Sequence, residues 1–421
     1  MQIAPKDSHY FDDNGDGLMQ YRSAPYRWIV LISVFPILAV TQIFWLTFSA
    51  ISPEAVQFYH TTSLSIAFLS MSYMIVYIIM MIPASLLADK KGLRASFVFG
   101  AVITAVFGLV RAFCGFNYTL VVIAQIGLAV AQPFLVNPIT KLAAVWFPVD
   151  ERATASGIAS VAGYIGIIIA MIATPALYHS FSMTGMLRIY GYIAVAAALL
   201  VIVLLKEKPE IPAGPRGDVD DNFSLRKVPE LRKNQNFVYL LMVVFIALGV
   251  FNALLTCISD MLSPRGISID QSGLIGGIII VAGLVGGVVI PLLSDKLKKR
   301  RIFLTISVLS ALIGMVGLSY INNYIALLIF AGITGFFLMG AGPMIFQYGT
   351  ELAYPTPEGT AYGLLMGSGQ VSGIIFILLL YLLRSSNGLM TVPLTILMAL
   401  MAVAFIISLR VKESVLIQTE D

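Results

Sequence analysis

The sequence predicts an all-α membrane protein with about 12 transmembrane helices, arranged as two six-helix halves. Three observations predict this fold class. The chain of 421 residues is 58% hydrophobic and only 11% charged, whereas soluble proteins carry about 25% charged residues. Its apolar runs reach the roughly 20 residues that a helix needs to cross the hydrocarbon layer. Sequence signatures in the first part of the chain also recur in the second.

The apolar runs divide into two groups of six, separated by a polar segment with four prolines. Prolines and charges in such a segment indicate a solvent-exposed linker. We expect a tail at 1–26, a first half at 27–205, the linker at 206–235, a second half at 236–409 and a tail at 410–421. The predicted spans are Arg27–Ala50, Leu64–Ala88, Leu93–Cys114, Tyr118–Trp146, Ala153–His179, Thr184–Leu205, Asn236–Leu262, Gln271–Ser294, Arg301–Tyr320, Tyr324–Leu352, Thr360–Leu383 and Met390–Leu409.

Lysine and arginine favour the cytoplasmic side of a membrane protein. If the N-terminus is cytoplasmic, 22 of the 26 basic residues fall inside. The N-terminal tail is polar and acidic, and it lacks the basic start and short apolar run of a signal peptide. We therefore expect an integral protein of the cell (inner) membrane with cytoplasmic N- and C-termini. The basic residues expected outside are Arg111, Arg188, Arg265 and Arg384.

Two charged signatures recur at nearly one offset. Asp89 and Asp295 each stand before a basic run at the end of a span, 206 positions apart. Glu151 and Glu358 each follow a proline three positions earlier and precede a span, 207 positions apart. Two signatures in the same register indicate a duplicated half, as is common among carriers.

The run Ser85-x-Leu87-Ala88-Asp89-Lys90-x-Gly92-Leu93-Arg94 resembles the loop signature G-x-L-x-D-[RK]-x-G-[RK] of the major facilitator superfamily, with Ser85 in place of the first glycine. A carboxylate at a helix end can interact with the positive N-terminus of a helix in the opposite half. The resemblance implies that such contacts latch the cytoplasmic gate; the alternative is that these charges only anchor loops. The expected gating residues are Asp89, Lys90, Arg94, Asp295, Glu151 and Glu358.

Polar side chains within spans are costly and face a cavity or another helix. For each of them, a hydrogen bond between helices is as good an explanation as contact with a ligand. As a set, amides and aromatic rings suit a neutral or zwitterionic solute, or a cation on ring faces. The candidate substrate-binding residues are Gln42, Trp45, Tyr73, Gln132, Asn252, Thr256, Gln347 and Gln370.

No acidic residue lies near the middle of a predicted span, which favours facilitated diffusion, although Asp260 near the outer end of the seventh span could still couple a proton. Cys114, Cys257 and the three histidines show no metal-ligand spacing. Clustered groups for nucleophilic or acid-base chemistry are also missing. We therefore expect no enzyme activity, catalytic residue, metal or cofactor. The expected partners are a small-molecule substrate and membrane lipid, without nucleic acid, for a monomeric protein.

Several stretches resemble the feline leukaemia virus subgroup C receptor family, a facilitator branch linked to choline, ethanolamine and haem. They are residues 69–74 (LSMSYM), 92–94 (GLR) and 141–147 (KLAAVWF). The resemblance implies that Trp45 is one wall of an aromatic cage for an amine, with Gln132 and Gln370 nearby. Asn252 stands where the family has a tyrosine, so the second wall is missing unless Phe251 substitutes.

The leading functional prediction is a secondary transporter of a small organic solute, with the substrate held between the halves as they alternate. An amine or other organic cation is the first substrate class. An organic anion or drug carrier of the same superfamily, coupled to protons, and a haem exporter are alternatives. A non-transporting membrane receptor or sensor is the alternative class, ahead of a membrane-embedded enzyme and a channel.

Overall fold

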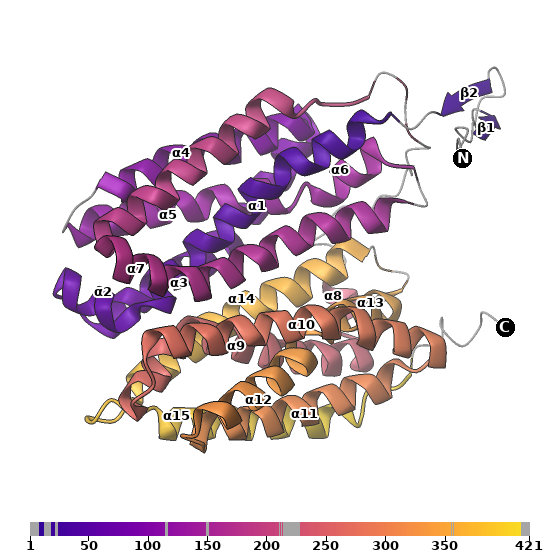
Figure 1. Ribbon diagram of the computed structural model, residues 1–421. Coiled ribbons are helices and arrows are strands. Elements are labelled where there is room, and N and C mark those ends of the chain that lie inside the picture. Colours follow the sequence, from indigo (N-terminus) through magenta and orange to yellow (C-terminus); the bar gives the residue numbers. More distant parts are fainter. Residues whose placement is uncertain are drawn as a thin grey trace. The chain divides into compact units, whose positions relative to one another are not determined.

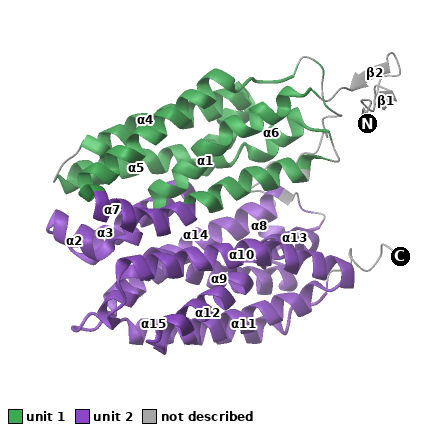
Figure 2. Ribbon diagram, viewed as in Figure 1, with its two compact units in different colours: residues 1–45, 79–166, 181–218 green, residues 46–78, 167–180, 219–421 purple. Residues whose placement is uncertain are grey.

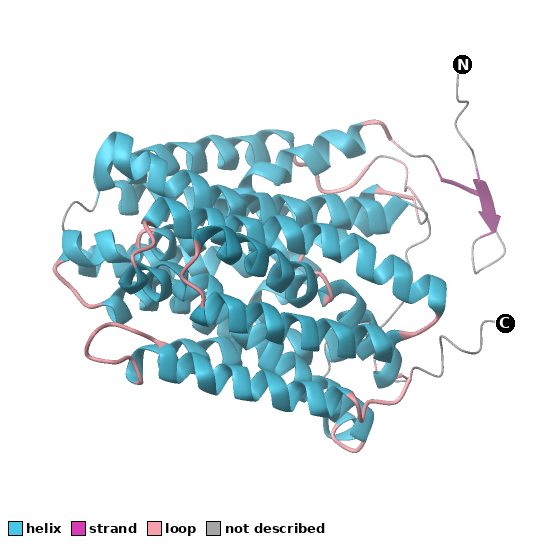
Figure 3. Cartoon of the chain, turned by 60° about the horizontal axis from the view of Figure 1, so that its bottom comes forward, coloured by secondary structure: helices cyan, strands magenta, loops and turns pink. Residues whose placement is uncertain are grey.

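The computed structural model describes residues 8–11, 18–21, 24–113, 117–148, 151–209, 211, 213, 228–354, 356 and 358–413. Helices joined by short loops make up nearly all of this part of the chain (Figure 3). Eleven helical segments within it are long and apolar enough to span a membrane. Cys114 lies outside the described residues.

The first part of the chain forms seven helices, labelled in Figure 1. The short α2 follows the first span and was not predicted, because eight residues are too few to show an apolar period. Pro53 suits its first turn. The helices are α1 (Tyr26–Ala50), α2 (Ser52–Tyr59), α3 (Ser63–Lys91), α4 (Leu93–Phe113), α5 (Tyr118–Val136), α6 (Ile139–Trp146) and α7 (Arg152–Leu204).

Helix α7 accounts for two of the predicted spans. Its 53 residues would extend about 80 Å at 1.5 Å per residue, more than twice the hydrocarbon thickness. Ser182, with φ 60° and ψ 176°, interrupts the helix between the two predicted spans. The described chain therefore supplies 12 spans, and the fold is that of 12 helices in two six-helix halves.

The second part forms α8 (Val228–Leu231), α9 (Gln235–Leu262), the 3-10 turn Ser263–Arg265, α10 (Ile269–Leu297), α11 (Arg300–Tyr320), α12 (Tyr324–Thr334), the π-helix η4 (Gly335–Met339), α13 (Gly342–Ala353), α14 (Glu358–Leu382) and α15 (Thr391–Ser408). In the N-terminal tail, β1 (Ser8–Phe11) pairs antiparallel with β2 (Leu18–Tyr21). This hairpin was not expected from the polar composition of the tail, but its strands carry aromatic and apolar residues that favour pairing.

The tenth predicted span is broken into α12, η4 and α13 by close packing on α10. A Cβ atom on Gly335 would overlap the carbonyl oxygen of Ile279, and one on Gly286 would overlap that of Phe336. Glycine lets the two backbones touch, as it does in membrane helix pairs generally. The π-helical turn at this contact is a deviation that an apolar run cannot reveal.

The chain forms two compact units (Figure 2). Unit 1 comprises residues 1–45, 79–166 and 181–218, and unit 2 comprises 46–78, 167–180 and 219–421. The boundaries of the units fall inside α1, α3 and α7. They follow packing and do not coincide with the expected halves, so the limits 27–205 and 236–409 stay a prediction.

Candidate functional site

Unit 1 holds three of the predicted substrate-binding residues, on α1 and α5. Trp45 is buried, while Gln42 and Gln132 are half-buried. The Gln42 side chain passes Gly163 of α7, where an added Cβ would lie 3.5 Å from its Cγ. These residues are thus polar or aromatic groups on helices that pack within one unit. Their contact with a ligand stays a prediction.

Unit 2 holds the other five, and it brings α3, α9 and α14 together around Asn252. The Asn252 Nδ2 atom donates to the Gly369 carbonyl oxygen at 3.2 Å. A Cβ on Gly373 would lie 2.9 Å from Met74 Sδ and 3.0 Å from Asn252 Nδ2. Tyr73 and Gln370 neighbour these contacts in sequence; Tyr73 is buried and Gln370 is half-buried, whereas Gln347 is exposed on α13.

Phe251 and Asn252 are consecutive residues of α9. Consecutive residues of a helix point about 100° apart, so their side chains leave the helix in different directions. The Asn252 amide donates to the backbone of α14. A role of Phe251 as the second aromatic wall, and contact of Asn252 with a ligand, stay predictions.

Thr256 keeps an unused hydrogen-bonding group one turn from Asn252. It is 1% exposed, and its hydroxyl has no hydrogen-bond partner among the described residues. Leaving a buried hydroxyl unpaired costs about 1–3 kcal/mol. Residues four apart lie on one helix face, so Asn252 and Thr256 offer two polar groups to the same neighbour.

A second polar centre of unit 2 lies at the end of α9 that we expect to face outward. Asp260 is 2% exposed, and its Oδ2 atom accepts from Ser52 Oγ at 2.7 Å and from the Tyr381 hydroxyl at 2.6 Å. These three residues, from α9, α2 and α14, are called the Asp260 cluster below. Among the described residues, Asp260 is the one acidic side chain that is buried within a span.

Contacts around the Asp260 cluster tie the same helices together. Ser259 Oγ donates to the Ala50 carbonyl oxygen at 2.9 Å, and Arg384 Nη1 donates to Ser63 Oγ at 3.0 Å. His179 Nε2 of α7 lies 3.2 Å from Asp270 Oδ2 of α10. The ends of α1, α2, α3 and α7 are thus fastened to α9, α10 and α14 by polar contacts within unit 2.

Glu54 of α2 lies beside this cluster, outside the spans. Burial raises the pKa of its carboxyl, with a smaller contribution in the same direction from Asp260 and Asp270, while a backbone hydrogen bond and His179 act in the opposite direction. Its Oε2 atom has no hydrogen-bond partner among the described residues. Ionised Glu54 therefore weakens this packing, and the penalty disappears as the pH falls through the raised pKa.

The predicted gating residues of unit 1 form ion pairs and hydrogen bonds at the opposite ends of the helices. Lys141 Nζ lies 3.0 Å from Asp89 Oδ1 and donates to the Ala88 carbonyl oxygen at 2.6 Å. Glu151 pairs with Arg27 at 3.0 Å. Lys90 is exposed. Asp89 thus has a partner on α6 of its own unit, and a latch to the other half stays a prediction.

The basic run of the second half has a different network. Arg300 binds both Asp295 and Glu351, with 3.1 Å between Arg300 Nη2 and Glu351 Oε1. The residue 207 positions before Arg300 is Leu93, so the first half has no guanidinium at the equivalent position. The side chain of Glu358 lies outside the described part of the structure.

Sequence reasoning missed a pair of glutamates that cap equivalent helices. Glu207 accepts from the backbone N–H groups of Leu93 and Arg94 at 2.8 and 2.7 Å. Glu413 accepts from those of Arg300 and Arg301 at 2.6 and 3.2 Å. The two glutamates are 206 positions apart, which is the offset of Asp89 and Asp295. A search for further residues at that offset would have found them.

These caps should contribute to stability in parallel. A carboxylate at a helix N-terminus satisfies free N–H groups and opposes the helix dipole. We expect Glu207→Ala and Glu413→Ala each to lower the free energy of unfolding by about 1 kcal/mol, and glutamine to restore part of each loss. Thermal unfolding of the two variants and of Glu230→Ala, an exposed glutamate of α8, checks this. Equal midpoints for all three would contradict it.

The comparisons with known proteins place this architecture in a family. The sequence matches the Major Facilitator Superfamily profile over residues 30–377. Choline/ethanolamine transporter FLVCR2 of Homo sapiens is 30% identical over 372 residues, which cover 83% of this chain and 70% of the human protein. Choline/ethanolamine transporter FLVCR1 of Mus musculus is 29% identical over 391 residues, covering 84% and 69%.

A solved structure has the same fold. It is a bacterial homologue of the human lysosomal transporter Spinster, in an inward-facing and unoccupied conformation, and its TM-score is 0.75 at 15% identity, over 93% of this chain and 99% of that one. The relatives are transporters and not enzymes, and the receptor or sensor alternative finds no support. The chain is an integral membrane protein and a secondary transporter of small organic solutes. It belongs to the major facilitator superfamily, in the branch of FLVCR1 and FLVCR2.

Proposed function

We propose that this protein carries a small organic amine of the choline or ethanolamine class across the cell membrane by alternating access, as a monomer with both termini in the cytoplasm. The observation that carries the proposal is Trp45 on α1, in a chain about 30% identical to named choline/ethanolamine transporters. The excess of lysine and arginine in the segments expected inside supports the orientation.

The chemistry of the predicted site suits a cation that is recognised without a carboxylate. An indole face attracts an ammonium group with about 0.5–2 kcal/mol, and amides can bind a hydroxyl group. Gln132, Asn252 and Gln370 supply amides, and Thr256 supplies a hydroxyl. The buried acid of the described spans, Asp260, is occupied by Ser52 and Tyr381. An amide at position 252 suits ethanolamine, which is small and carries a hydroxyl group, better than an aromatic ring at that position would.

Alternating access requires contacts that hold one gate closed and that break when this gate opens. The Asp260 cluster and the Arg384–Ser63 bond are hydrogen bonds, and the groups released when this end opens can bond to water instead. At the opposite ends, Asp89 and Asp295 are proposed to latch the cytoplasmic gate when the halves close there. Absence of a buried carboxylate from the middle of the described spans favours facilitated diffusion.

Uptake into proteoliposomes tests the proposal. We expect saturable uptake of radiolabelled choline and ethanolamine that persists when the pH gradient is collapsed. Trp45→Ala should raise the half-saturating concentration roughly tenfold, because loss of about 1.4 kcal/mol of cation–π attraction is tenfold in affinity, and Trp45→Phe should recover part of it. Trp28→Ala, which removes an indole that is 38% exposed on the same helix, is the matched control.

Two results would contradict the proposal. Uptake of both amines no faster than in empty vesicles would remove the substrate class. Uptake that requires a proton gradient and an anionic or drug-like substrate would favour the alternative carrier, for which Asp260 is the titratable group.

A further inference from the structure

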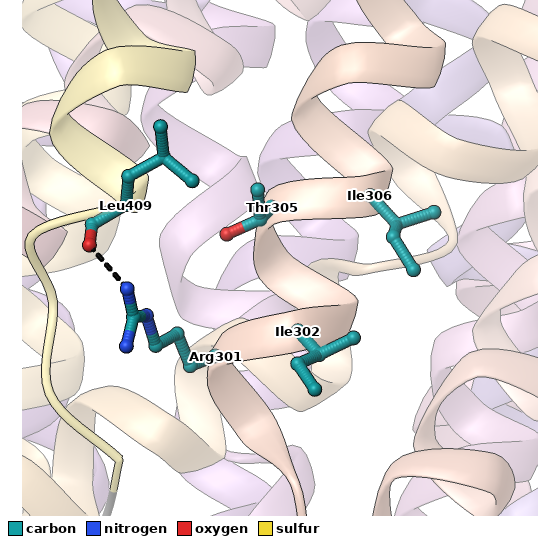
Figure 4. Close-up of a pocket in the computed structure, with 5 residues that line it drawn as sticks. All are labelled: Arg301, Ile302, Thr305, Ile306 and Leu409. Carbon is teal, nitrogen blue, oxygen red and sulfur yellow. Dashed lines mark hydrogen bonds between the residues drawn. The ribbon is translucent and has the colours of Figure 1, made fainter.

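A small pocket opens between the ends of α11 and α15, where the second basic run begins. It is lined by Arg301, Ile302, Thr305, Ile306 and Leu409 (Figure 4). All five residues belong to unit 2, and none is among the substrate-binding or gating residues. The pocket combines one guanidinium with three aliphatic side chains, which is the composition of a site for a molecule with a charged head and an apolar tail.

The aliphatic part of the pocket faces away from the protein interior. Ile302, Ile306 and Leu409 are 45%, 46% and 45% exposed. They lie on helices that span the membrane, so their exposed surfaces meet lipid and not water. An acyl chain lying along α11 would therefore find apolar neighbours here.

The polar part of the pocket has hydrogen-bond donors to spare. In the described part of the chain, the Arg301 side chain makes one hydrogen bond, from Nη2 to the Leu409 carbonyl oxygen at 2.6 Å (Figure 4). Its Nε and Nη1 groups remain for a ligand. Thr305, one turn along the same face, has its Oγ1 atom 3.2 Å from Ser408 Oγ, which donates its single proton to the Phe405 carbonyl oxygen at 2.7 Å. A guanidinium with unused N–H groups suits the oxygens of a phosphate, and the Thr305 hydroxyl lies beside it.

The equivalent arginine of the first half lacks this capacity. Arg94, 207 positions earlier, donates Nε to the Leu205 carbonyl oxygen at 2.8 Å and Nη2 to that of Ile202 at 3.1 Å. Both halves therefore have an arginine at this position, but only Arg301 keeps two of its guanidinium nitrogens free of hydrogen bonds within the described residues. The duplication of the fold does not by itself explain this difference.

The surrounding charges favour an anion. Lys296, Lys299 and Arg410 are exposed at the same end of these helices. The nearby acids are engaged: Asp295 and Glu351 bind Arg300, and Glu413 caps the first turn of α11. Basic pockets between membrane helices on the cytoplasmic side bind anionic lipid head groups.

We propose that this pocket binds an anionic glycerophospholipid, with the phosphate on Arg301 and Thr305 and an acyl chain against Ile302, Ile306 and Leu409. The lipid would brace the ends of α11 and α15, which the Arg301–Leu409 bond already joins. This inference does not depend on the transported substrate.

Native mass spectrometry of the purified full-length protein with phosphatidylglycerol or phosphatidylcholine of the same acyl chains tests the site. We expect phosphatidylglycerol to be retained in preference, and Arg301→Gln to lower its retained fraction about fivefold, since one basic residue contributes about 1 kcal/mol at an anionic surface. Lys208→Gln, which removes an exposed charge of unit 1, should retain it as the unaltered protein does. Inorganic phosphate should leave thermal stability unchanged.

A second variant covers the case in which Arg301→Gln does not fold. Ile306→Trp fills the apolar part of the pocket without changing charge, and it should also reduce retention of phosphatidylglycerol. Equal retention of the two lipids, or undiminished retention by both variants, would overturn the proposal. Stabilisation by inorganic phosphate equal to that by phosphatidylglycerol would overturn it as well, because it would identify a phosphate site that needs no lipid.

Discussion

Replacing Asp260 with alanine should make Cys257 react with a membrane-impermeant maleimide at least tenfold faster. Cys257 is 1% exposed and lies next to Tyr381 in the Asp260 cluster. The alanine removes the shared acceptor of Ser52 and Tyr381. Each hydrogen bond contributes about 0.5–1.5 kcal/mol, so the loss of two costs roughly 1.4 kcal/mol, which is tenfold in an equilibrium. The measurement uses a Cys114→Ser background, in which Cys257 is the remaining cysteine.

Two further variants separate opening of the cluster from general unfolding. Tyr381→Phe removes one hydrogen bond without a change of charge, so its labelling rate should lie between those of the unaltered protein and Asp260→Ala. Gln57→Ala changes an exposed polar residue of α2 at the same end and should label slowly. Slow labelling of Asp260→Ala, or equally fast labelling of Gln57→Ala, would show that the Asp260 cluster does not hold this end closed.

Asp260→Asn tests whether transport is coupled to protons, which Asp260→Ala does not. Asparagine can still accept a hydrogen bond through its amide oxygen, but it cannot titrate. Under facilitated diffusion, Asp260→Asn should keep amine uptake that is independent of the pH gradient. If the proton-coupled alternative holds, the same variant should lose accumulation driven by a proton gradient while exchange of substrate across the membrane continues.

The fold was predictable because its signals are local and strong. Apolar runs, the polar linker and the basic loops require no knowledge of contacts, and they led to 12 spans in two halves. The short α2, the π-helical turn at Gly335 and the hairpin in the tail were missed. Each is too short for an apolar period to appear, and the π-helical turn is caused by α10, which lies more than 35 residues earlier in the chain.

The site was harder, because a polar residue in a span has the same appearance whether it meets a ligand or a helix. Asn252 was chosen as a ligand residue, and the structure gives its amide to the Gly369 carbonyl oxygen. Asp260 was placed near an outer end, but its partners on α2 and α14 come from distant parts of the sequence. Thr256, another predicted substrate-binding residue, has a hydroxyl group without a hydrogen-bond partner among the described residues.

Arg111 shows the same limit in a basic residue. Its place near a predicted span end suggests a side chain that reaches the interface, but the structure buries it. Arg111 is 1% exposed. Its Nη1 atom donates to Gln125 Oε1 at 2.9 Å and to the Phe44 carbonyl oxygen at 3.3 Å, and Gln125 Nε2 donates to the same carbonyl oxygen at 2.9 Å. The guanidinium also lies 4.3 Å from the centre of the Phe44 ring.

Arg111→Ala should therefore be among the most destabilising single changes in unit 1. It empties the volume of a large buried side chain and leaves the Gln125 carbonyl oxygen without its donor. Breaking a buried charged network costs about 3–5 kcal/mol, and we expect the thermal midpoint to fall by roughly 5–10 °C. The control is Arg188→Ala, an exposed arginine of α7 whose guanidinium lies 5.7 Å from the Phe113 ring. Equal midpoints for the two variants would show that the buried contacts add little.

A double variant tests the cause of the loss. Arg111→Met combined with Gln125→Leu keeps the volume filled and leaves neither partner of the lost bond unpaired. Replacing a whole buried polar network with apolar residues is often nearly neutral, whereas removing one partner is not. The double variant should consequently unfold at a higher temperature than Arg111→Met alone. If it unfolds lower, the two side chains act independently, and the contribution of Arg111 comes from its packing against Phe44 and not from its hydrogen bonds.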